Sequence, residues 1–266
     1  MPTDRLFPAL LKYWRGRRGM SQLDLGLAAD VSARHISFLE SGRARPSAEM
    51  VLRLLHNLNV PLRAQNEGLR AAGFEPRFPE ATGVAALPVE IDGAIARMMA
   101  QHEPFPLVVL SATYEILRAN EGARRLFRLF AGDDARRDEP AADMFELVFD
   151  SARLRPFVAN WPQLARGMLA RLHLDVLQAP FDEALSALLA RALRYPGVPP
   201  EWRQPDFAAE LTGAVTVHLR RGDLDLSFLN TITTFSAPRS VAVEELRIES
   251  AFPLDEPTRA ACQRLA

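Results

Sequence analysis

Apolar residues recur at helical spacing along the first 80 positions of the chain. They fall three or four residues apart in short segments, which is the period of a helix with one buried face. Serines stand at the start of three segments, where a hydroxyl can accept hydrogen bonds from unpaired amide groups. The pattern predicts five helices: 7–18, 22–29, 32 to a stop at 42, 47–58 and 62–72. The expected buried positions of the second helix are Leu23, Leu25, Leu27 and Ala28.

A very short turn joins the second and third of these helices. Only Asp30 and Val31 lie between them, and Gly42 is suited to end the third helix because glycine adopts a left-handed conformation without steric cost. Ile36 and Leu39 form the apolar side of the third helix. Its other side is short, polar and basic and consists of Ala33, Arg34, Ser37 and Phe38. Such a helix is typical of one that lies in the DNA major groove.

The pattern changes after residues 73–90, a connector in which Gly and Pro residues fall close together. Helical spacing over 89–101 predicts a docking helix. An apolar run from residue 107, a turn and a second short strand then precede a helix that Asn120 can cap. Two further sets are expected to be apolar sides, namely Ile91, Ile95, Met98 and Met99 on the docking helix, and Ala123, Leu126, Phe127 and Phe130 on the capped helix.

Helices are expected next, and after them apolar and polar residues alternate with the period of two that is typical of strands. The helices are predicted at 144–149, 154–176 and 182–193, and the charged segment 132–139 is predicted as a solvated loop. Apolar residues alternate through Val215, Val217 and Leu219 and again through Leu224, Leu226 and Phe228, on either side of a turn at 221–223. One more strand is expected within 240–249.

These elements predict two domains with a connector between them. Residues 1–75 are expected to form an all-α helix-turn-helix domain of five helices, and 76–97 a linker with the docking helix. Residues 98–266 contain a strand pair, several helices and late strands. That order predicts an α+β domain in which helices cover one face of an antiparallel sheet.

The segment from Met20 to Ser47 resembles the XRE-type, phage-repressor-like helix-turn-helix regulators, whose pattern is SQxxLxxxAxVSxxxISxLExGxxxPS. The matching positions are Ser21, Gln22, Leu25, Ala29, Val31, Ser32, Ile36, Ser37, Leu39, Glu40, Gly42, Pro46 and Ser47. The resemblance implies sequence-specific binding to double-stranded DNA. A homodimer is expected, because two modules that read two half-sites multiply the few contacts that one makes.

Roles within this module follow from position on the third helix. Arg34 is the candidate for reading a guanine edge, a contact worth roughly 1–3 kcal/mol of discrimination. Ser37 is expected to contact a base or a phosphate, and Phe38 either packs on a thymine methyl group or belongs to the core. Glu40 is expected to form an ion pair with Arg17 or Arg18, since a carboxylate facing phosphates would repel them.

Other residues of the module are expected to position it on the DNA. Ser41, Arg43 and Arg45 follow the third helix as candidate phosphate contacts. Gln22 is similar to the family's backbone and base contact. The predicted DNA-binding residues are Gln22, Ser32, Ala33, Arg34, His35, Ser37, Phe38, Ser41, Arg43 and Arg45.

The rest of the chain resembles the MmyB-like regulators, in which a PAS-like ligand-binding domain follows the helix-turn-helix. The resemblance is carried by the segment VVLSATYEILRANEGARRLF and by 144–172, where Trp161, Ala165 and Leu169 are spaced by four residues. It implies a cavity between sheet and helices for a small apolar molecule, which is fatty-acid-like in this family. We can match nothing to the family within 173–213.

The cavity wall that the resemblance implies is drawn mainly from large apolar residues, each of which is equally an ordinary core residue. The predicted ligand-binding residues are Val108, Leu110, Arg118, Phe127, Phe145, Phe149, Trp161, Met168 and Leu172. An acidic ligand would also need a polar anchor, and the sequence leaves Arg118, His173, His218 and Asn160 as alternatives.

Charge and composition agree with this division. Residues 1–80 carry twelve Lys or Arg against eight Asp or Glu, a net charge of +4, and residues 81–266 carry twenty against twenty-five, a net charge of −5. No apolar run reaches the roughly 18 residues of a membrane span, and no secretory signal is visible. Cys262 is the single cysteine, so no disulfide can form within the chain. A cytoplasmic protein that associates with the bacterial nucleoid when bound to DNA is expected.

Catalysis is not expected. The five histidines have no metal-ligand spacing, the only lysine is Lys12, and neither a GxSxG motif nor a glycine-rich phosphate loop occurs. No metal or cofactor is expected beyond a bound fatty acid or similar small apolar ligand. The sequence leaves two functions open: a ligand-responsive transcription factor, and a DNA-bound scaffold whose second domain mediates dimerisation or protein contacts.

Overall fold

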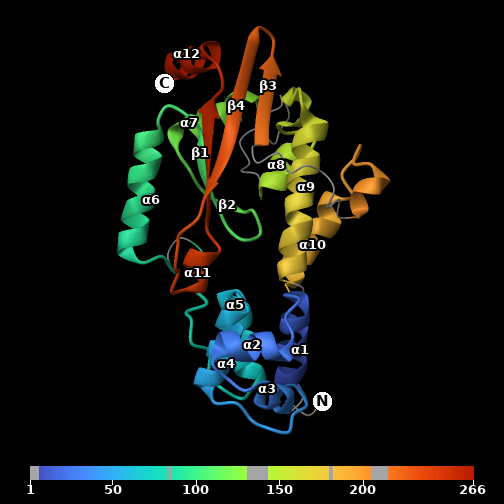
Figure 1. Cartoon of the computed structure of the whole chain (residues 1–266). Coiled ribbons are helices and arrows are strands. Elements are labelled where there is room, and N and C mark those ends of the chain that lie inside the picture. Colours follow the sequence, from blue (N-terminus) through green and yellow to red (C-terminus); the bar gives the residue numbers. More distant parts are fainter. Residues whose placement is uncertain (1–5, 82, 84–85, 131–142, 180–181, 205–214) are drawn as a thin grey trace. The chain divides into compact units, whose positions relative to one another are not determined.

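The computed structural model describes residues 6–81, 83, 86–130, 143–179, 182–204 and 215–266 (Figure 1). It divides into two compact units. The N-terminal unit comprises Met1–Thr82 and Ala237–Glu244, and the sheet unit comprises Gly83–Ser236 and Glu245–Ala266. The charged segment 132–139, which was predicted as a solvated loop, lies outside the described residues.

The N-terminal unit contains the five helices that apolar spacing predicts. They are α1 (Leu6–Arg17), α2 (Gln22–Ala29), α3 (Ala33–Glu40), α4 (Ala48–Asn57) and α5 (Leu62–Ala71). Their buried side chains form a single cluster that includes Leu11, Trp14, Leu25, Ile36 and Leu54. Helical periodicity is sufficient here because each helix contributes one apolar stripe to the same core.

The predicted serine caps are confirmed. Ser21 Oγ accepts from Asp24 N at 3.1 Å, and the Asp24 carboxylate accepts from Ser21 N at 2.8 Å, which completes a capping box. Ser32 and Ser47 each accept a backbone hydrogen bond at 3.2 Å from the third residue after them. Gly42 has a φ of +73°, as expected for the residue that follows the end of α3.

At the turn between α2 and α3, the backbone of α2 approaches the turn more closely than the sequence pattern suggests. A Cβ on Gly26 would lie 2.5 Å from Val31 O, so only glycine permits this approach of the two backbones. Burial on α2 is therefore confined to Leu25, Gly26 and Ala29. The expectation that Leu23, Leu27 and Ala28 are buried is wrong, because the helix meets its neighbours along one narrow stripe. Leu23 is 59% exposed and Leu27 is 75% exposed.

The sheet unit is an α+β domain whose five antiparallel strands have the order β2-β1-β5-β4-β3. The strands are β1 (Leu107–Leu110), β2 (Ile116–Ala119), β3 (Val215–Arg221), β4 (Leu224–Thr233) and β5 (Arg247–Pro253). The helices are α6 (Val89–His102), α7 (Glu121–Phe130), α8 (Met144–Phe149), α9 (Trp161–Gln178), α10 (Glu183–Ala192) and α12 (Glu256–Leu265), with the short 3-10 helices η3 (Arg155–Phe157) and η4 (Pro200–Arg203). The predicted fold class is confirmed.

Two predicted elements differ from the structure. The helix expected over 154–176 is divided into η3 and α9, because Pro156 and Pro162 lack the amide hydrogen that a continuous helix needs. The strand expected over 240–249 begins only at Arg247. Before it lies the short helix α11 (Val241–Glu244), in which Val241, Ala242 and Val243 are all buried.

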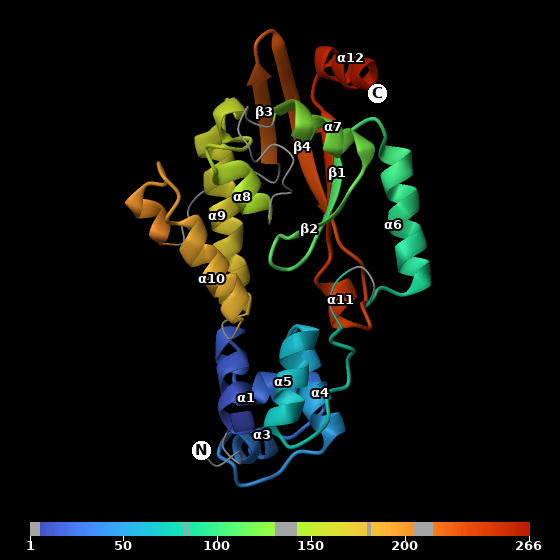
Figure 2. The ribbon, with the colours of Figure 1, turned by 180° about the vertical axis from the view of Figure 1, so that it is seen from behind.

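Helices cover both faces of the sheet, as Figures 1 and 2 show, so the expectation that helices cover only one face is wrong. On the outer face, Ile95 of α6 packs with Leu107, Val109 and Ile248, so the predicted docking helix is confirmed. On the inner face, Val108 and its alternate neighbours pack with α7, α8 and α9. The period of two along each strand thus separates two apolar clusters.

Asn120 connects the first strand to α7. Its Oδ1 accepts hydrogen bonds from Leu107 N and Ala123 N, both at 2.9 Å, and its Nδ2 donates to Phe105 O at 2.8 Å. The side chain is buried, and these bonds satisfy both ends of the amide. The predicted cap is therefore also a structural link between two elements.

The connection between β4 and β5 belongs to the N-terminal unit, although both of its strands belong to the sheet unit. Val241 is fully buried there, and its amide donates to Pro79 O at 3.1 Å. The Glu244 carboxylate accepts from Leu62 N, the first residue of α5, at 2.7 Å. Because Pro61 offers no side-chain cap, Glu244 caps α5 from a distant part of the sequence.

We predict that Glu244→Ala lowers the free energy of unfolding of the N-terminal unit by about 1 kcal/mol, because the start of α5 loses a capping carboxylate. Hydrogen exchange of the full chain should become faster in the first turn of α5. The matched control is Glu115→Ala, which removes an exposed carboxylate in the sheet unit. Unchanged exchange in α5 would contradict the capping role.

Candidate functional site

The outward side of α3 presents the predicted reading residues. Ser32, Arg34 and Ser41 are exposed, and the other side chains on this surface are half-buried. The Arg34 guanidinium lies 5.3 Å from the centroid of the Phe38 ring, in a cation–π contact. Phe38 is half-buried, whereas Ile36 and Leu39 of the same helix are fully buried, and its ring lies under the Arg34 guanidinium.

The end of α3 holds the residues predicted to contact phosphates. Arg43 and Ala44 donate their backbone amides to Phe38 O, at 2.9 and 3.2 Å, which folds the chain back over the helix end. Ser41 Oγ donates to the same carbonyl at 3.2 Å. This closure fixes the backbone at Arg43, whose side chain is exposed, as is that of Arg45.

Glu40 forms an ion pair with Arg15, and the prediction of Arg17 or Arg18 as its partner is wrong. Arg15 Nε and Nη2 donate to the two carboxylate oxygens at 2.6 and 3.0 Å. Arg15 lies beside the buried Trp14 at the edge of the apolar stripe of α1, whereas Arg17 contacts Tyr13 OH. Arg18 instead donates to Leu58 O at 2.6 Å at the end of α4.

Gln22 takes part in the same network, because its Nε2 donates to Glu40 Oε2 at 2.8 Å. Burial opposes ionisation of Glu40, but the hydrogen bonds from Arg15 and Gln22 outweigh it and leave the pKa of Glu40 below its usual value. One carboxylate therefore connects α1, the start of α2 and the end of α3. The amide of Gln22 is oriented by this bond at the edge of the α3 surface.

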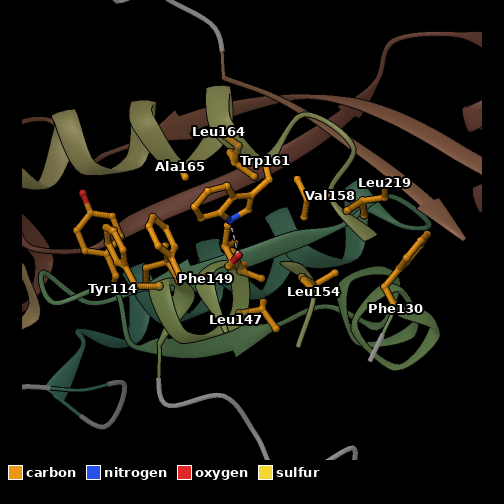
Figure 3. Close-up of a cluster of buried hydrophobic side chains, with 14 of the residues drawn as sticks. Tyr114, Phe130, Leu147, Phe149, Leu154, Val158, Trp161, Leu164, Ala165 and Leu219 are labelled. Carbon is orange, nitrogen blue, oxygen red and sulfur yellow. Dashed lines mark hydrogen bonds between the residues drawn. The ribbon is translucent and has the colours of Figure 1, made fainter. Parts of the chain in front are cut away.

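Most of the predicted ligand-binding residues lie together on the inner face of the sheet. Figure 3 shows part of this cluster, in which Trp161 Nε1 donates to Val148 O at 3.0 Å. The buried members are Val108, Leu110, Phe145, Phe149, Trp161 and Leu172. Phe127 and Met168 are partly buried and pack against them.

Arg118 does not join this cluster. It pairs with Val109, whose side chain belongs to the outer face, and it forms an ion pair there with Asp92 of α6. The regular pairing of Val108 with Ala119 and of Val109 with Arg118 places Arg118 on the outer face, and the irregular register begins only after it, between Val109 and Leu110. Sequence spacing alone could not reveal this pairing.

The side chains of two other candidate anchors, His173 and Asn160, are held by backbone groups. His173 Nε2 lies 3.0 Å from Trp202 O. Asn160 donates to Thr216 O and accepts from His218 N, both at 3.0 Å, and so fastens the start of α9 to β3.

A polar cluster that the sequence reasoning missed lies on the inner face instead. Tyr114 OH donates to Asp175 Oδ2 at 2.7 Å, and Arg247 Nη1 approaches the same oxygen at 2.9 Å. Arg247 also lies over the Tyr114 ring, 4.5 Å from its centroid. Burial raises the pKa of the Tyr114 hydroxyl, so it acts as a donor throughout the physiological range.

Glu249 and Arg171 complete this polar cluster. Burial raises the pKa of the Glu249 carboxyl, although Arg171 and Arg247 act in the opposite direction. Alternation along β5 could have indicated that Arg247 and Glu249 share a face. It could not have indicated that the face is the buried one opposite α9.

A small pocket lined by Pro104, Gly122, Leu126, Leu226 and Cys262, among others, has room for about one water molecule and contains none of the predicted ligand residues. Among the described residues, no group of His, Cys, Asp and Glu could hold a metal ion. None of the described helices combines the length and the apolar character needed to cross a membrane.

Comparisons with known proteins agree with this organisation. Residues 91–265 match the family model described as MmyB-like transcription regulator ligand binding domain, and residues 11–65 match the model described as Helix-turn-helix. No match was found among curated proteins. Among solved structures, the chain is similar to "Structure of an RNA-binding Light-Oxygen-Voltage Receptor", with 12% identity and a TM-score of 0.25 over 96% of this chain and 63% of that chain. The match thus spans less than two thirds of that chain.

We predict that Glu40→Gln destabilises the N-terminal unit by about 1–3 kcal/mol, because Arg15 loses its charged partner in a half-buried site. In the wild type this contribution is present above the pKa of an unfolded glutamate and is lost as the pH falls through the lowered pKa of the folded state. The difference between wild type and variant should therefore shrink in acid. Thermal unfolding between pH 3 and 7 measures it, with Glu49→Gln, an exposed carboxylate of α4, as the control.

Proposed function

The chain belongs to the family of MmyB-like transcription regulators, and we propose that it is a dimeric regulator whose DNA affinity responds to a small apolar ligand. The helix-turn-helix and the ligand-binding domain make it a DNA-binding transcriptional regulator with a ligand-binding domain. A fatty acid is the ligand class that we propose. The observation that favours a sensor is that α11 belongs to the N-terminal unit although it stands in the chain between β4 and β5 of the sheet unit.

In the proposed DNA complex, α3 lies in the major groove. Arg34 reads a guanine edge and is held by the ring of Phe38, while Ser37 contacts a neighbouring base or phosphate. Ser32, Ala33 and His35 line the start of the same helix. Gln22, Ser41, Arg43 and Arg45 complete the contacts and set the position of the module on the backbone.

The homodimer is proposed from charge. The net charge of +4 on residues 1–80 is small for tight binding to DNA by one module. Two modules that bind half-sites about one helical turn apart would double the phosphate contacts. Sedimentation at micromolar concentration tests this, and a monomer that binds a single half-site tightly would contradict it.

The proposed ligand site lies between the inner face of the sheet and α8 and α9. Its apolar side chains come from strands and helices that are separate in sequence, which include Val108, Phe145, Phe149 and Leu172. Ligand sites commonly combine such an apolar wall with a few polar groups that fix the orientation of the ligand. The cluster around Arg247 would supply those groups.

The physical route from ligand to DNA is proposed to run through α11. This helix packs with α5 in the N-terminal unit, and it is joined directly to β4 and β5, which carry part of the inner face. A ligand that favours one arrangement of these strands would therefore favour one arrangement of the residues that cap α5. A scaffold would have no need of such a connection.

Two alanine substitutions test the DNA contacts on an operator selected from random duplexes. We expect Arg34→Ala to relax the preference at one base position, with a loss of about 1–3 kcal/mol for the wild-type base. Arg43→Ala should weaken binding to all DNA sequences alike. It should also reduce the slope of log affinity against log salt concentration by up to about one unit. Equal and uniform losses from both variants would exclude Arg34 as the base-reading residue.

Ligand response is tested with tetradecanoate, and with butyrate as a control that lacks a long apolar tail. We expect tetradecanoate to raise the thermal unfolding temperature and to change operator affinity by about five- to hundredfold. Stabilisation without any change in DNA binding would favour the scaffold. A core of this kind could bury aliphatic chains of about 10 to 18 carbons. If no acid, alcohol or amide in this range raised the unfolding temperature, an aliphatic ligand would be excluded.

A further inference from the structure

Phe38 is a large aromatic residue that lies outside the core of the N-terminal unit. It is neither a member of the apolar cluster of this unit nor one of the partly buried residues that pack against that cluster. Leu52 and Phe74, which are half-buried like Phe38, do pack against it. The Phe38 ring is therefore not an ordinary core residue and is available for a contact outside the protein.

The backbone of Phe38 is held firmly, so the ring has a defined place. Its carbonyl oxygen accepts three hydrogen bonds, from Arg43 N at 2.9 Å, from Ala44 N at 3.2 Å and from Ser41 Oγ at 3.2 Å. All three donors belong to the segment that follows α3. Only rotation of the side chain remains, and the Arg34 guanidinium lies over the ring.

Arg34 can keep its hydrogen-bond donors available while it contacts this ring. A guanidinium that stacks on an aromatic face directs its N–H groups in its own plane, away from that face. The carboxylate of α3, Glu40, is bound by Arg15 and Gln22 instead. The exposed Arg34 side chain can thus donate to a guanine edge while the ring remains against its face.

The separation of the two groups matches neighbouring levels of a DNA duplex. The guanidinium carbon of Arg34 lies 5.3 Å from the centroid of the Phe38 ring, and successive bases are about 3.4 Å apart along the duplex axis. When the guanidinium lies in the plane of a guanine, the ring therefore lies beside the next base pair. The apolar group that a base pair presents in the major groove is the C5-methyl group of thymine.

We propose that Arg34 and Phe38 act as one unit that reads a C5-methylated pyrimidine beside guanine, and that operator affinity therefore depends on this methyl group. This inference rests on the proposed position of α3 in the major groove and names the second base that it reads. In unmodified DNA the methylated pyrimidine is thymine. 5-Methylcytosine carries its methyl group at the same ring position, so the unit also distinguishes 5-methylcytosine from cytosine.

The chemistry of the pair favours the methyl group over the polar edge of the base. The side chain of Phe38 has no donor or acceptor, so it forms no hydrogen bond with O4 of thymine or with the amino group of cytosine. A methyl group against the ring loses contact with water, which is favourable. Uracil and unmethylated cytosine offer no such group to the ring.

The test measures the affinity of the full chain for four operator duplexes. The operator is selected from random duplexes, and Arg34→Ala identifies the guanine by the loss of preference at one position. In one half-site, the pyrimidine beside that guanine is then thymine, uracil, cytosine or 5-methylcytosine. We expect the duplex with thymine to bind about three- to tenfold more tightly than that with uracil, and 5-methylcytosine to exceed cytosine by the same factor.

Variants of Phe38 assign the methyl preference to the ring. Phe38→Ala should bring both ratios of affinities to about one, whereas Phe38→Tyr keeps the ring and should retain them. Each ratio compares two duplexes with the same protein sample, so a loss of folded protein does not alter it. The matched control is Phe78→Ala, which removes a half-buried phenylalanine of the same unit outside α3 and should leave both ratios unchanged.

The other outcomes separate this inference from the function on which it rests. Equal affinities for thymine and uracil, or for 5-methylcytosine and cytosine, would overturn the proposal, as would unchanged ratios in Phe38→Ala. A selected operator without an A·T pair beside the guanine would overturn it too. In these cases a guanine preference that Arg34→Ala abolishes would still support the proposed reading by α3. A selection without any preferred sequence would overturn both.

Discussion

The constraint on which the rest of this structure depends is the path of the chain between β4 and β5. Antiparallel neighbours are usually joined by about two to five residues, but here residues 234–246 leave the sheet and contribute α11 to the N-terminal unit. Burial of Val241 and the bond from Leu62 N to Glu244 hold that excursion in place. The chain thus passes between the two units three times, after Thr82, after Ser236 and after Glu244.

A second constraint acts inside each unit, where one carboxylate contacts several side chains at once. Glu40 accepts from Arg15 and Gln22 and so sets the positions of three helix segments around the α3 surface. Asp175 accepts from Tyr114 and balances Arg247 on the inner face of the sheet. In both places the charged groups lie at the edge of an apolar cluster, where an ion pair with good geometry offsets its own desolvation.

Local rules accounted for much of the fold. Serine caps, helical spacing and alternation predicted the five N-terminal helices, the docking helix and the hairpin of β3 and β4, because short-range backbone preferences determine these elements. The errors arose where neighbours distant in sequence intervene. Leu23 and Leu27 are apolar but exposed, and the apolar residues 241–243 form a helix because α5 and Pro79 provide their partners.

The sequence by itself determined the helix-turn-helix surface, since Arg34, Ser37 and the caps around them follow from spacing within one short segment. The sequence could not determine the partner of Glu40, the face of Arg118 or the meeting of Arg247, Glu249, Asp175 and Tyr114. Those depend on strand register and on which helix covers which face. Such features are decided by packing between segments that are separate in sequence, from 25 residues apart for Arg15 and Glu40 to 61 for Tyr114 and Asp175, and local periodicity contains no information about them.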